Sequence, residues 1–247
     1  MFQVITLNLN YRVAKHGAWE ARRALIVEAV RRVEPDLLVL QAVEGSDGAS
    51  QAAELAALLN YPHLAFAAAM TDGEVSRGSA FVSRRPLENV ATRRLTRRGD
   101  HDDTGQRVVL RARVQTDAGA IDVYNAHFSW VPEQALENAR ETLQFRAAGP
   151  ALLLGDLNSA PDSPVVQDLQ RAGLLDMWAT LRPEDSGYTF EADRPTQRID
   201  YALATPDVQA RVRHIERVGI AGGAPPRLSD HLGLLVTLSE VRSSGVH

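Results

Sequence analysis

The spacing of apolar residues changes along the chain and predicts where helices and strands lie. From Trp19 to Val33, apolar residues recur at helical spacing with Arg and Glu between them, and Pro35 ends the pattern. Further helices are expected at 50–59, 132–146 and 163–172, the second of which opens with a proline. Apolar or alternating runs predict strands at 2–9, 36–41, 63–70, 79–83, 89–95, 107–114, 121–128, 151–154, 199–204, 208–218 and 228–238.

The order of these elements predicts the fold class. Helices occur early and in the middle of the chain, and several consecutive strands lie between them, which does not suit a regular βαβ repeat. The pattern favours an α/β (α+β) fold in which two packed sheets carry helices on their outer faces. We expect one domain over residues 1–240 and a mobile tail over 241–247, because the turn-rich loops are too short to be interdomain linkers.

Composition narrows the class of protein further. The chain contains no cysteine, so neither disulfides nor thiolate metal sites contribute to it. No apolar stretch is long enough to span a bilayer, and the first residues read as a strand instead of a signal peptide, so we expect a cytoplasmic protein. The net charge of -4 argues against indiscriminate binding to nucleic acid, although local basic patches could still serve.

Polar residues that follow apolar strands are the candidates for chemistry. In Gly155-Asp156-Leu157-Asn158, the glycine permits close approach, and Asp156 and Asn158 share one side of an extended chain. A carboxylate and an amide on one side can hold a hydrated cation or orient a water molecule, although an ordinary turn has the same composition. Further candidates are Asn8 after Thr6-Leu7, His127 after Tyr124-Asn125-Ala126, Asp200 in Arg198-Ile199-Asp200-Tyr201, and the pair Asp230-His231.

Each of these further candidates has an ordinary structural explanation when taken alone. His127 could be a hydrogen-bonded structural histidine, and Asp200 could form a surface ion pair beside a strand. Asn8 could cap a turn. Asp230 and His231 are neighbours, and neighbours in a regular strand point to opposite faces, so this pair needs an irregular backbone to act together.

The order of the segments supplies stronger support, because the chain resembles the endonuclease/exonuclease/phosphatase superfamily from Thr6 to Leu234. The resemblance implies a four-layer αββα sandwich of two mostly antiparallel sheets, with an active site at one edge where strand ends converge. It also implies hydrolysis of phosphoesters with Mg²⁺ or Mn²⁺. The segments that carry the resemblance, in order, are 6–8, 40–41, 127, 155–158, 198–201 and 229–231, and the run 78–84 is similar to a mid-sheet strand of the family.

By that resemblance, Asn8 helps to hold the metal or the phosphate. Asp156 orients or deprotonates the attacking water, with Asn158 beside it. Asp230 is a metal ligand paired with His231, which contacts the phosphate or takes part in proton transfer.

The resemblance also gives roles to two other side chains. His127 stabilises the phosphoryl oxygens or protonates the leaving group, and Asp200 orients neighbouring groups, with His127 as a candidate partner. The physical logic is general, because a cation neutralises developing charge while a positioned water attacks in line. Hard oxygen ligands suit Mg²⁺.

The chain departs from the family pattern at Ala42. The family places a glutamate that binds the metal after the segment Leu40-Gln41, and alanine cannot bind a cation. Three explanations are open: a deliberate Glu→Ala change, a natural member with weakened metal binding, or substitution by Glu44. We favour the first two, because Glu44 would lie about 6–7 Å further along the strand.

The substrate depends on loops outside these motifs. The stretch Arg93-Arg94-Leu95-Thr96-Arg97-Arg98 could grip a nucleic-acid backbone, but the acidic run 100–103 beside it favours a solvated turn. Trp130 could form an apolar wall or stack on a base, with core packing as the simpler interpretation. Arg77 and Arg107 could reach a phosphate, and surface salt bridges are the more ordinary role.

Three functions remain in competition. The first is a metal-dependent phosphodiesterase or nuclease, which acts on a phosphodiester that could be nucleic acid. The second is a non-catalytic phosphate-binding or partner-binding member of the same fold, which Ala42 would support if it is natural. The third is a phosphomonoesterase.

Overall fold

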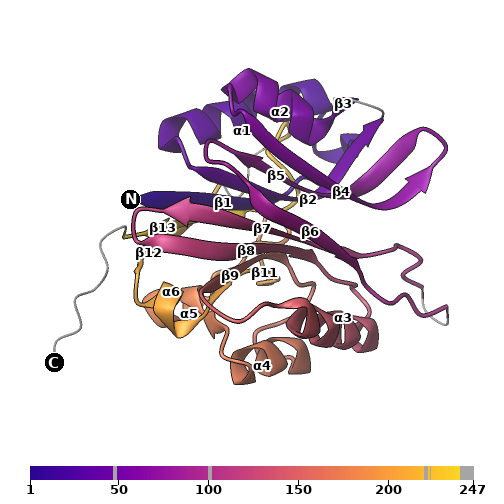
Figure 1. Ribbon diagram of the computed structural model, residues 1–247. Helices are drawn as coiled ribbons and strands as arrows, with labels where there is room; N and C mark the ends of the chain where they lie inside the picture. Colours follow the sequence, from indigo (N-terminus) through magenta and orange to yellow (C-terminus); the bar gives the residue numbers. More distant parts are fainter. Residues whose placement is uncertain (47–48, 100–101, 220–221, 223, 240–247) are drawn as a thin grey trace, which may run out of the picture.

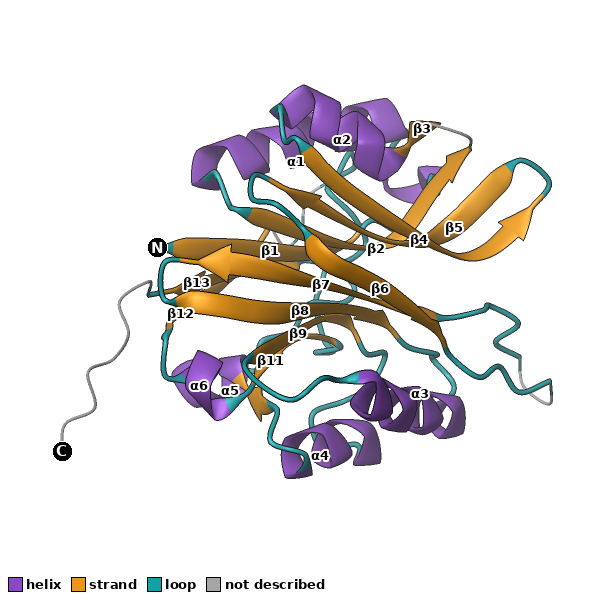
Figure 2. Ribbon diagram, in the orientation of Figure 1, coloured by secondary structure: helices purple, strands orange, loops and turns teal. Residues whose placement is uncertain are grey.

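The computed structural model describes residues 1–46, 49–99, 102–219, 222 and 224–239. Two β-sheets pack face to face, and helices cover the outer face of each sheet (Figure 1). The four layers are clearest in Figure 2, where the helices lie above and below the paired sheets. The expected αββα sandwich is therefore confirmed, whereas the expected mobile tail lies outside the described residues.

The first sheet is built around a parallel pair of strands. Its strands follow the order β12-β13-β1-β2-β5-β4, with the short strand β3 paired to β2. Among the described residues, only β1 and β2 run parallel within this sheet, and its other pairs are antiparallel. The strands are β1 (Phe2–Asn8), β2 (Leu37–Ser46), β3 (Ala49–Ser50), β4 (His63–Asp72), β5 (Val75–Ser83), β12 (Val212–Val218) and β13 (Gly233–Leu238).

The second sheet repeats this arrangement. Its order is β10-β11-β9-β8-β7-β6, and only β8 and β9 are parallel. The parallel pair of each sheet therefore lies in its interior, with antiparallel neighbours on both sides. The strands are β6 (Glu88–Arg94), β7 (Val108–Thr116), β8 (Gly119–His127), β9 (Ala151–Asp156), β10 (Leu175–Asp176) and β11 (Asp200–Ala204).

The helices begin and end at residues whose chemistry suits those positions. Ser50 and Ser163 accept backbone hydrogen bonds at the starts of two helices, and Asn60 adopts the left-handed conformation after one of them. The first sheet is covered by α1 (Trp19–Val33) and α2 (Gln51–Leu59) (Figure 1). The remaining helices are η1 (Ala14–His16), α3 (Pro132–Phe145), α4 (Pro164–Arg171), α5 (Met177–Leu181) and α6 (Pro206–Gln209).

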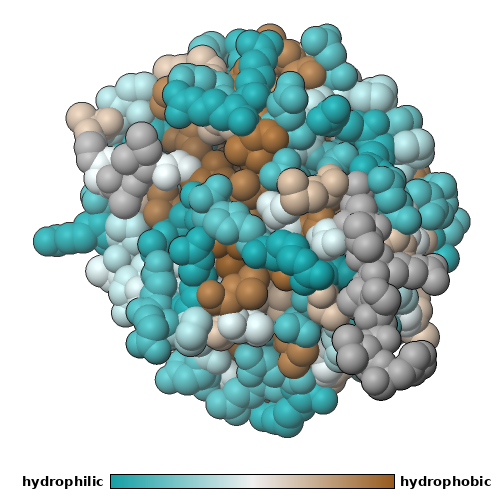
Figure 3. All heavy atoms as spheres, turned by 90° about the vertical axis from the view of Figure 1, so that its left-hand side faces the viewer, coloured by the Kyte–Doolittle hydropathy of each residue, from teal (hydrophilic) through white to brown (hydrophobic). Residues whose placement is uncertain are grey.

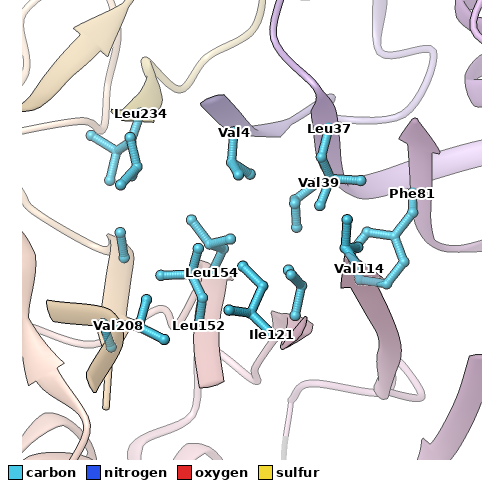
Figure 4. Close-up of a cluster of buried hydrophobic side chains, with 14 of the residues drawn as sticks. Val4, Leu37, Val39, Phe81, Val114, Ile121, Leu152, Leu154, Val208 and Leu234 are labelled. Carbon is cyan, nitrogen blue, oxygen red and sulfur yellow. The ribbon is translucent and has the colours of Figure 1, made fainter. Parts of the chain in front are cut away.

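Three apolar clusters hold the layers together. The largest lies between the sheets, where Val4 and Leu37 face Leu152 and Leu154 (Figure 4). The other two lie between each sheet and its own helices. At the end of the molecule where the chain begins, hydrophobic residues gather in the middle of the face with hydrophilic residues around them (Figure 3).

A buried polar bridge crosses the sheet interface. Gln41 of β2 donates from Nε2 to Oδ1 of Asn125 in β8 at 2.8 Å, and Asn125 donates from Nδ2 to the backbone oxygens of Leu40 and Ala80 at 3.0 and 2.9 Å. Both side chains are fully buried. Buried amides cost free energy unless their hydrogen bonds are made, so this bridge fixes how the two sheets are aligned.

Two expected strands near the C-terminus are shorter in the structure than predicted. The expected strand 208–218 begins only at Val212, because Pro206 opens the short helix α6 before it. The expected strand 228–238 begins only at Gly233, and residues 228–232 form an irregular loop. None of the helices among the described residues is both long and apolar enough to cross a membrane.

Candidate active site

Strand register brings three of the predicted residues side by side. In the parallel pair β8–β9, His127 lies opposite Asp156, and in the antiparallel pair β11–β9, Asp200 lies opposite the same residue. From the facing sheet, Asn8 at the end of β1 donates from Nδ2 to Oδ2 of Asp156 at 2.8 Å. Asp156 is therefore the centre of the site, at the end of β1 that is remote from the N-terminus.

The Asp156 carboxylate is held by further hydrogen bonds. Its Oδ1 accepts from the backbone N–H of Asn158 at 2.8 Å, and the Asn158 side chain donates to the backbone oxygen of Phe128 at 3.0 Å. Gly155 permits this arrangement, because its φ is +137° and a Cβ there would lie 1.9 Å from the Ala126 oxygen. The carboxylate is thus fixed before any ligand arrives.

The irregular loop 228–232 brings His231 to the opposite side of Asp156. Its Nδ1 lies 2.9 Å from Oδ2 of Asp200, and its Nε2 lies 3.8 Å from Oδ2 of Asp156. The Phe190 ring packs against the imidazole with a centroid distance of 4.8 Å. The loop itself is anchored by two backbone hydrogen bonds, from Ala192 to Asp230 and from Leu232 to Thr189.

The structure corrects one detail of the sequence analysis. His127 was the candidate partner of Asp200, but Asp200 bonds to His231 instead. The reason is the strand order, since β9 separates β8 from β11 and places Asp156 between His127 and Asp200. Nε2 of His127 lies 3.6 Å from Oδ2 of Asp156.

The two histidines have opposite electrostatic surroundings. Burial disfavours the charged form of His231, but the carboxylates of Asp200 and Asp156 outweigh it and raise its pKa to about 10. Burial lowers the pKa of His127 to about 3, and the positive charge of Arg107 adds to this effect. The site therefore holds one imidazolium that can donate two hydrogen bonds and one neutral imidazole.

The donor atoms around the site are those that hard cations prefer. Among the described residues, Asp156, Asp200 and His231 form one compact group whose ligand atoms lie within 4.8 Å of one another. Asp230 adds a carboxylate whose Oδ1 lies 4.0 Å from Nε2 of His231. Oxygen donors of this kind suit Mg²⁺ and Mn²⁺.

Ala42 occupies a bulge that directs its side chain to the same place. The pairing of β2 with β5 shifts register between Leu40 and Val43, and Ala42 has a φ of +48°. Its backbone oxygen accepts from the N–H of Tyr11 at 2.8 Å, so the bulge is fixed by the chain that follows Asn8. Left-handed backbone is unfavourable for a residue with a Cβ, and such strain is often found at functional sites.

Glu44 forms ion pairs with two arginines. Its Oε2 accepts from Nε of Arg77 at 3.0 Å, and its Oε1 lies 3.9 Å from Nε of Arg12. Glu44 does not line the pocket that contains Ala42. These contacts favour the interpretation that the carboxylate expected at position 42 has no replacement from Glu44.

One pocket of about 490 Å³ is lined by Asp156, His127 and His231, whereas Asp200 and Asp230 do not line it. It includes Arg107, whose Nη2 pairs with Asp103 at 2.8 Å and whose buried Nε finds no hydrogen-bond partner in the part of the chain that is described. Arg77 does not line it. The lining residues are Asn8, Asn10, Tyr11, Ala42, Arg107, His127, Trp130, Asp156, Asn158, Phe190, Gln197, Ile199 and His231.

Two aromatic residues at the site, Phe190 and Tyr11, had no signal in the sequence pattern, and the expectation for a third, Trp130, is wrong. Phe190 packs on His231 from an irregular segment, where periodicity offers no signal. Tyr11 lies just beyond Asn8, and burial raises the pKa of its phenol although Arg107 and Arg77 oppose this. Core packing was the simpler expectation for Trp130, which is wrong because its side chain is 51% exposed at the pocket.

The fold and pocket define a four-layer sandwich protein whose acidic and basic groups gather where the strands of both sheets end. The chain belongs to the Endonuclease/Exonuclease/phosphatase family, whose model matches residues 5–231. Membership supports phosphoester hydrolysis as the general activity of this site. A search among curated protein sequences finds no match.

Solved structures agree with this assignment at the level of the fold. An endonuclease/exonuclease/phosphatase family protein from Leptotrichia buccalis matches with a TM-score of 0.79 and 16% identity, covering 97% of this chain and 100% of that one. A mannosyl-6-phosphatase from Bacteroides thetaiotaomicron matches with a TM-score of 0.73 and 17% identity over 97% and 100%. An AP endonuclease from Archaeoglobus fulgidus matches with a TM-score of 0.66 and 21% identity over 97% and 100%.

Proposed function

We propose that this protein hydrolyses a phosphodiester in a reaction that depends on Mg²⁺ or Mn²⁺, as a nuclease or as a phosphodiesterase for small substrates. The observation that carries the proposal is the convergence of Asn8, His127 and His231 on the single carboxylate of Asp156 inside an open pocket, with Asp200 opposite Asp156 on the adjacent strand. Phosphodiester hydrolysis needs a positioned water, a base to orient it and positive groups around the phosphoryl oxygens.

Asp156 is the residue that we assign to the attacking water. Its carboxylate is fixed by Asn8 and by the backbone N–H of Asn158, so it can accept the proton of a water without moving. Asn158 also offers its side chain to the pocket, where it can orient the same water or a phosphoryl oxygen. Fixed geometry of this kind is the main contribution that a protein makes to such a reaction.

His231 and His127 are assigned to the phosphoryl group and the leaving group. Asp200 holds His231 as an imidazolium, and the N–H at Nε2 is free to bond a phosphoryl oxygen or to protonate the departing oxygen. Neutral His127 faces the pocket from the other side and can donate one hydrogen bond to the phosphate. Arg107 adds a positive charge at the same wall.

The divalent cation would be held by oxygen atoms of Asn8 and Asp230, with position 42 as the missing third contributor. When bound, it would supply positive charge that neutralises the developing charge on the phosphate. The carboxylates of Asp156, Asp200 and Asp230 outnumber the positive groups of His231 and Arg107 at this site, so a bound cation would favour the binding of a phosphate.

Ala42 supports a second candidate function for the chain as it stands. With a methyl group at the expected metal ligand, the protein could bind a phosphate or a partner without turning it over. In that case the Asp156 site would persist as a binding site. The two functions differ in whether any metal concentration restores hydrolysis.

A hydrolysis screen tests the proposal. The chain and its Ala42→Glu variant are assayed with bis(4-nitrophenyl) phosphate and 4-nitrophenyl phosphate in Mg²⁺, Mn²⁺ or Ca²⁺. We expect metal-dependent turnover of the diester that rises about 10- to 100-fold in Ala42→Glu, since even outer contacts to a metal are worth that much. Preference for the monoester would identify a phosphomonoesterase, and absence of turnover in both proteins with every metal would favour the non-catalytic alternative.

A further inference from the structure

The three tryptophans of the chain have different surroundings. Trp19 and Trp178 are 4% and 3% exposed, and their indole N–H groups donate to Glu54 and to the backbone oxygen of Asp185, each at 2.9 Å. Trp130 is 51% exposed, and its N–H has no hydrogen-bond partner among the residues that the structure describes. An indole that stays half in water adds little to the core, so its surface is available to a ligand.

Trp130 lies at the wall of the catalytic pocket. It follows His127 by three residues and lines the pocket together with His127, Asn158 and Asp156. A substrate whose phosphate contacts His127 would therefore place its organic part within reach of the indole. The pocket volume of about 490 Å³ is in the range of sites for small organic ligands.

The backbone that carries Trp130 is fixed on both sides. The N–H of Ser129 donates to Oδ1 of Asn138 at 3.1 Å, and the Ser129 hydroxyl donates to Asp103 at 2.6 Å and accepts from the N–H of Val131 at 3.1 Å. Helix α3 then begins at Pro132. Because the chain is already ordered here, little entropy is lost when a ligand binds the indole.

We propose that Trp130 is a specificity-determining residue that stacks on the aromatic base of a nucleoside phosphoester whose phosphate lies at Asp156. This inference rests on the proposed function and names its substrate class. The indole offers a wide apolar face and one N–H donor, which suits a planar base. Stacking on an indole accepts any base, because every base has a planar π-face.

Binding measurements test the stacking without requiring turnover. Adenosine 5′-monophosphate and ribose 5-phosphate carry the same phosphate and sugar but differ in the base. Each is titrated into the parent chain, Trp130→Ala and Trp130→Phe in the presence of Mg²⁺, and binding is followed by calorimetry and by indole fluorescence. Leu64→Ala is the matched control, because Leu64 is 43% exposed on β4 and does not line the pocket.

We expect Trp130→Ala to lose about 5- to 150-fold in affinity for adenosine 5′-monophosphate, the size of one base-stacking contact, and nothing for ribose 5-phosphate. Trp130→Phe keeps part of the affinity, and Leu64→Ala keeps all of it. The nucleotide quenches the fluorescence of the parent more than that of Trp130→Phe. Equal losses for both ligands, or a parent chain that binds neither at millimolar concentration, would overturn the proposal.

A kinetic comparison separates this proposal from the proposed function. In the Ala42→Glu background, hydrolysis of thymidine 5′-(4-nitrophenyl) phosphate is compared with that of methyl 4-nitrophenyl phosphate, with and without Trp130→Ala. Stacking predicts a higher KM for the thymidine ester alone, with kcat little changed. Turnover of both esters with no selective change in KM contradicts the stacking only, whereas absence of turnover with intact nucleotide binding contradicts the hydrolase function only.

Discussion

The two halves of the pocket differ in how many of the expected polar side chains they contain. On one side, Asp200 is hydrogen-bonded to His231, and Asp156 lies opposite Asp200 in fixed strand register and accepts from the backbone N–H of Asn158. On the other side, Asn8 and Ala42 line the pocket, and Ala42 lies on a strained bulge and has no polar side chain to offer. The scaffold for acid–base chemistry and the site for a cation are therefore separable, because one side chain can be missing while the rest keeps its geometry.

The largest loss of activity is expected when Asp156, at the centre of the intact half, is replaced. Asp156→Asn removes the carboxylate that accepts hydrogen bonds from Asn8 and Asn158. We expect kcat/KM for a phosphodiester to fall by about 10²- to 10⁴-fold, since a positioned base contributes that much. Steady-state kinetics in the Ala42→Glu background provide the measurement, with thermal unfolding to show that the fold is kept. Activity within a few-fold of the parent would remove Asp156 from the assigned role.

A smaller loss of activity is expected when Asp200, the hydrogen-bond partner of His231, is replaced. Asp200→Asn leaves Nδ1 of His231 with a neutral partner, so the imidazolium loses its nearest counter-charge. We expect kcat to fall by about 10²-fold, at the lower end for a proton-transfer group, while KM changes little. A role limited to folding would instead lower the unfolding midpoint and leave the kcat of the folded fraction unchanged.

The smallest change in activity is expected when Glu44, two residues after Ala42 on β2, is replaced. Glu44→Gln breaks a partly exposed ion pair with Arg77, which is worth about 1 kcal/mol or less. The metal dependence of hydrolysis should stay within about twofold of the parent, because we expect no cation contact there. A large rise in the metal concentration needed for half-maximal activity would show that Glu44 does replace the missing ligand.

Much of this molecule could be predicted from the chain alone. Apolar spacing located α1 at its observed bounds and most strands to within a few residues. Each of these elements is local, and its pattern repeats several times, so the signal is strong. The order of the polar segments also predicted Asn8, His127, Asp156 and His231 at one site, and these four residues line the same pocket.

The remainder depends on contacts that no local pattern encodes. The bond from Asp200 to His231 follows from the order β8-β9-β11 and from an irregular loop at 228–232. Phe190 reaches the site from a segment without periodicity. The exposure of Trp130 depends on which neighbours leave it uncovered, and an apolar side chain in a sequence gives no sign of that.

The difference between the two halves is tested most directly by metal binding. Calorimetric titration of Mn²⁺ into the parent chain, Ala42→Glu and the isosteric Ala42→Gln compares a carboxylate with a neutral side chain at the same bulge. We expect an affinity about 10- to 100-fold higher for Ala42→Glu than for the other two proteins. Equal affinities in all three proteins, or the tightest binding by the parent, would contradict it.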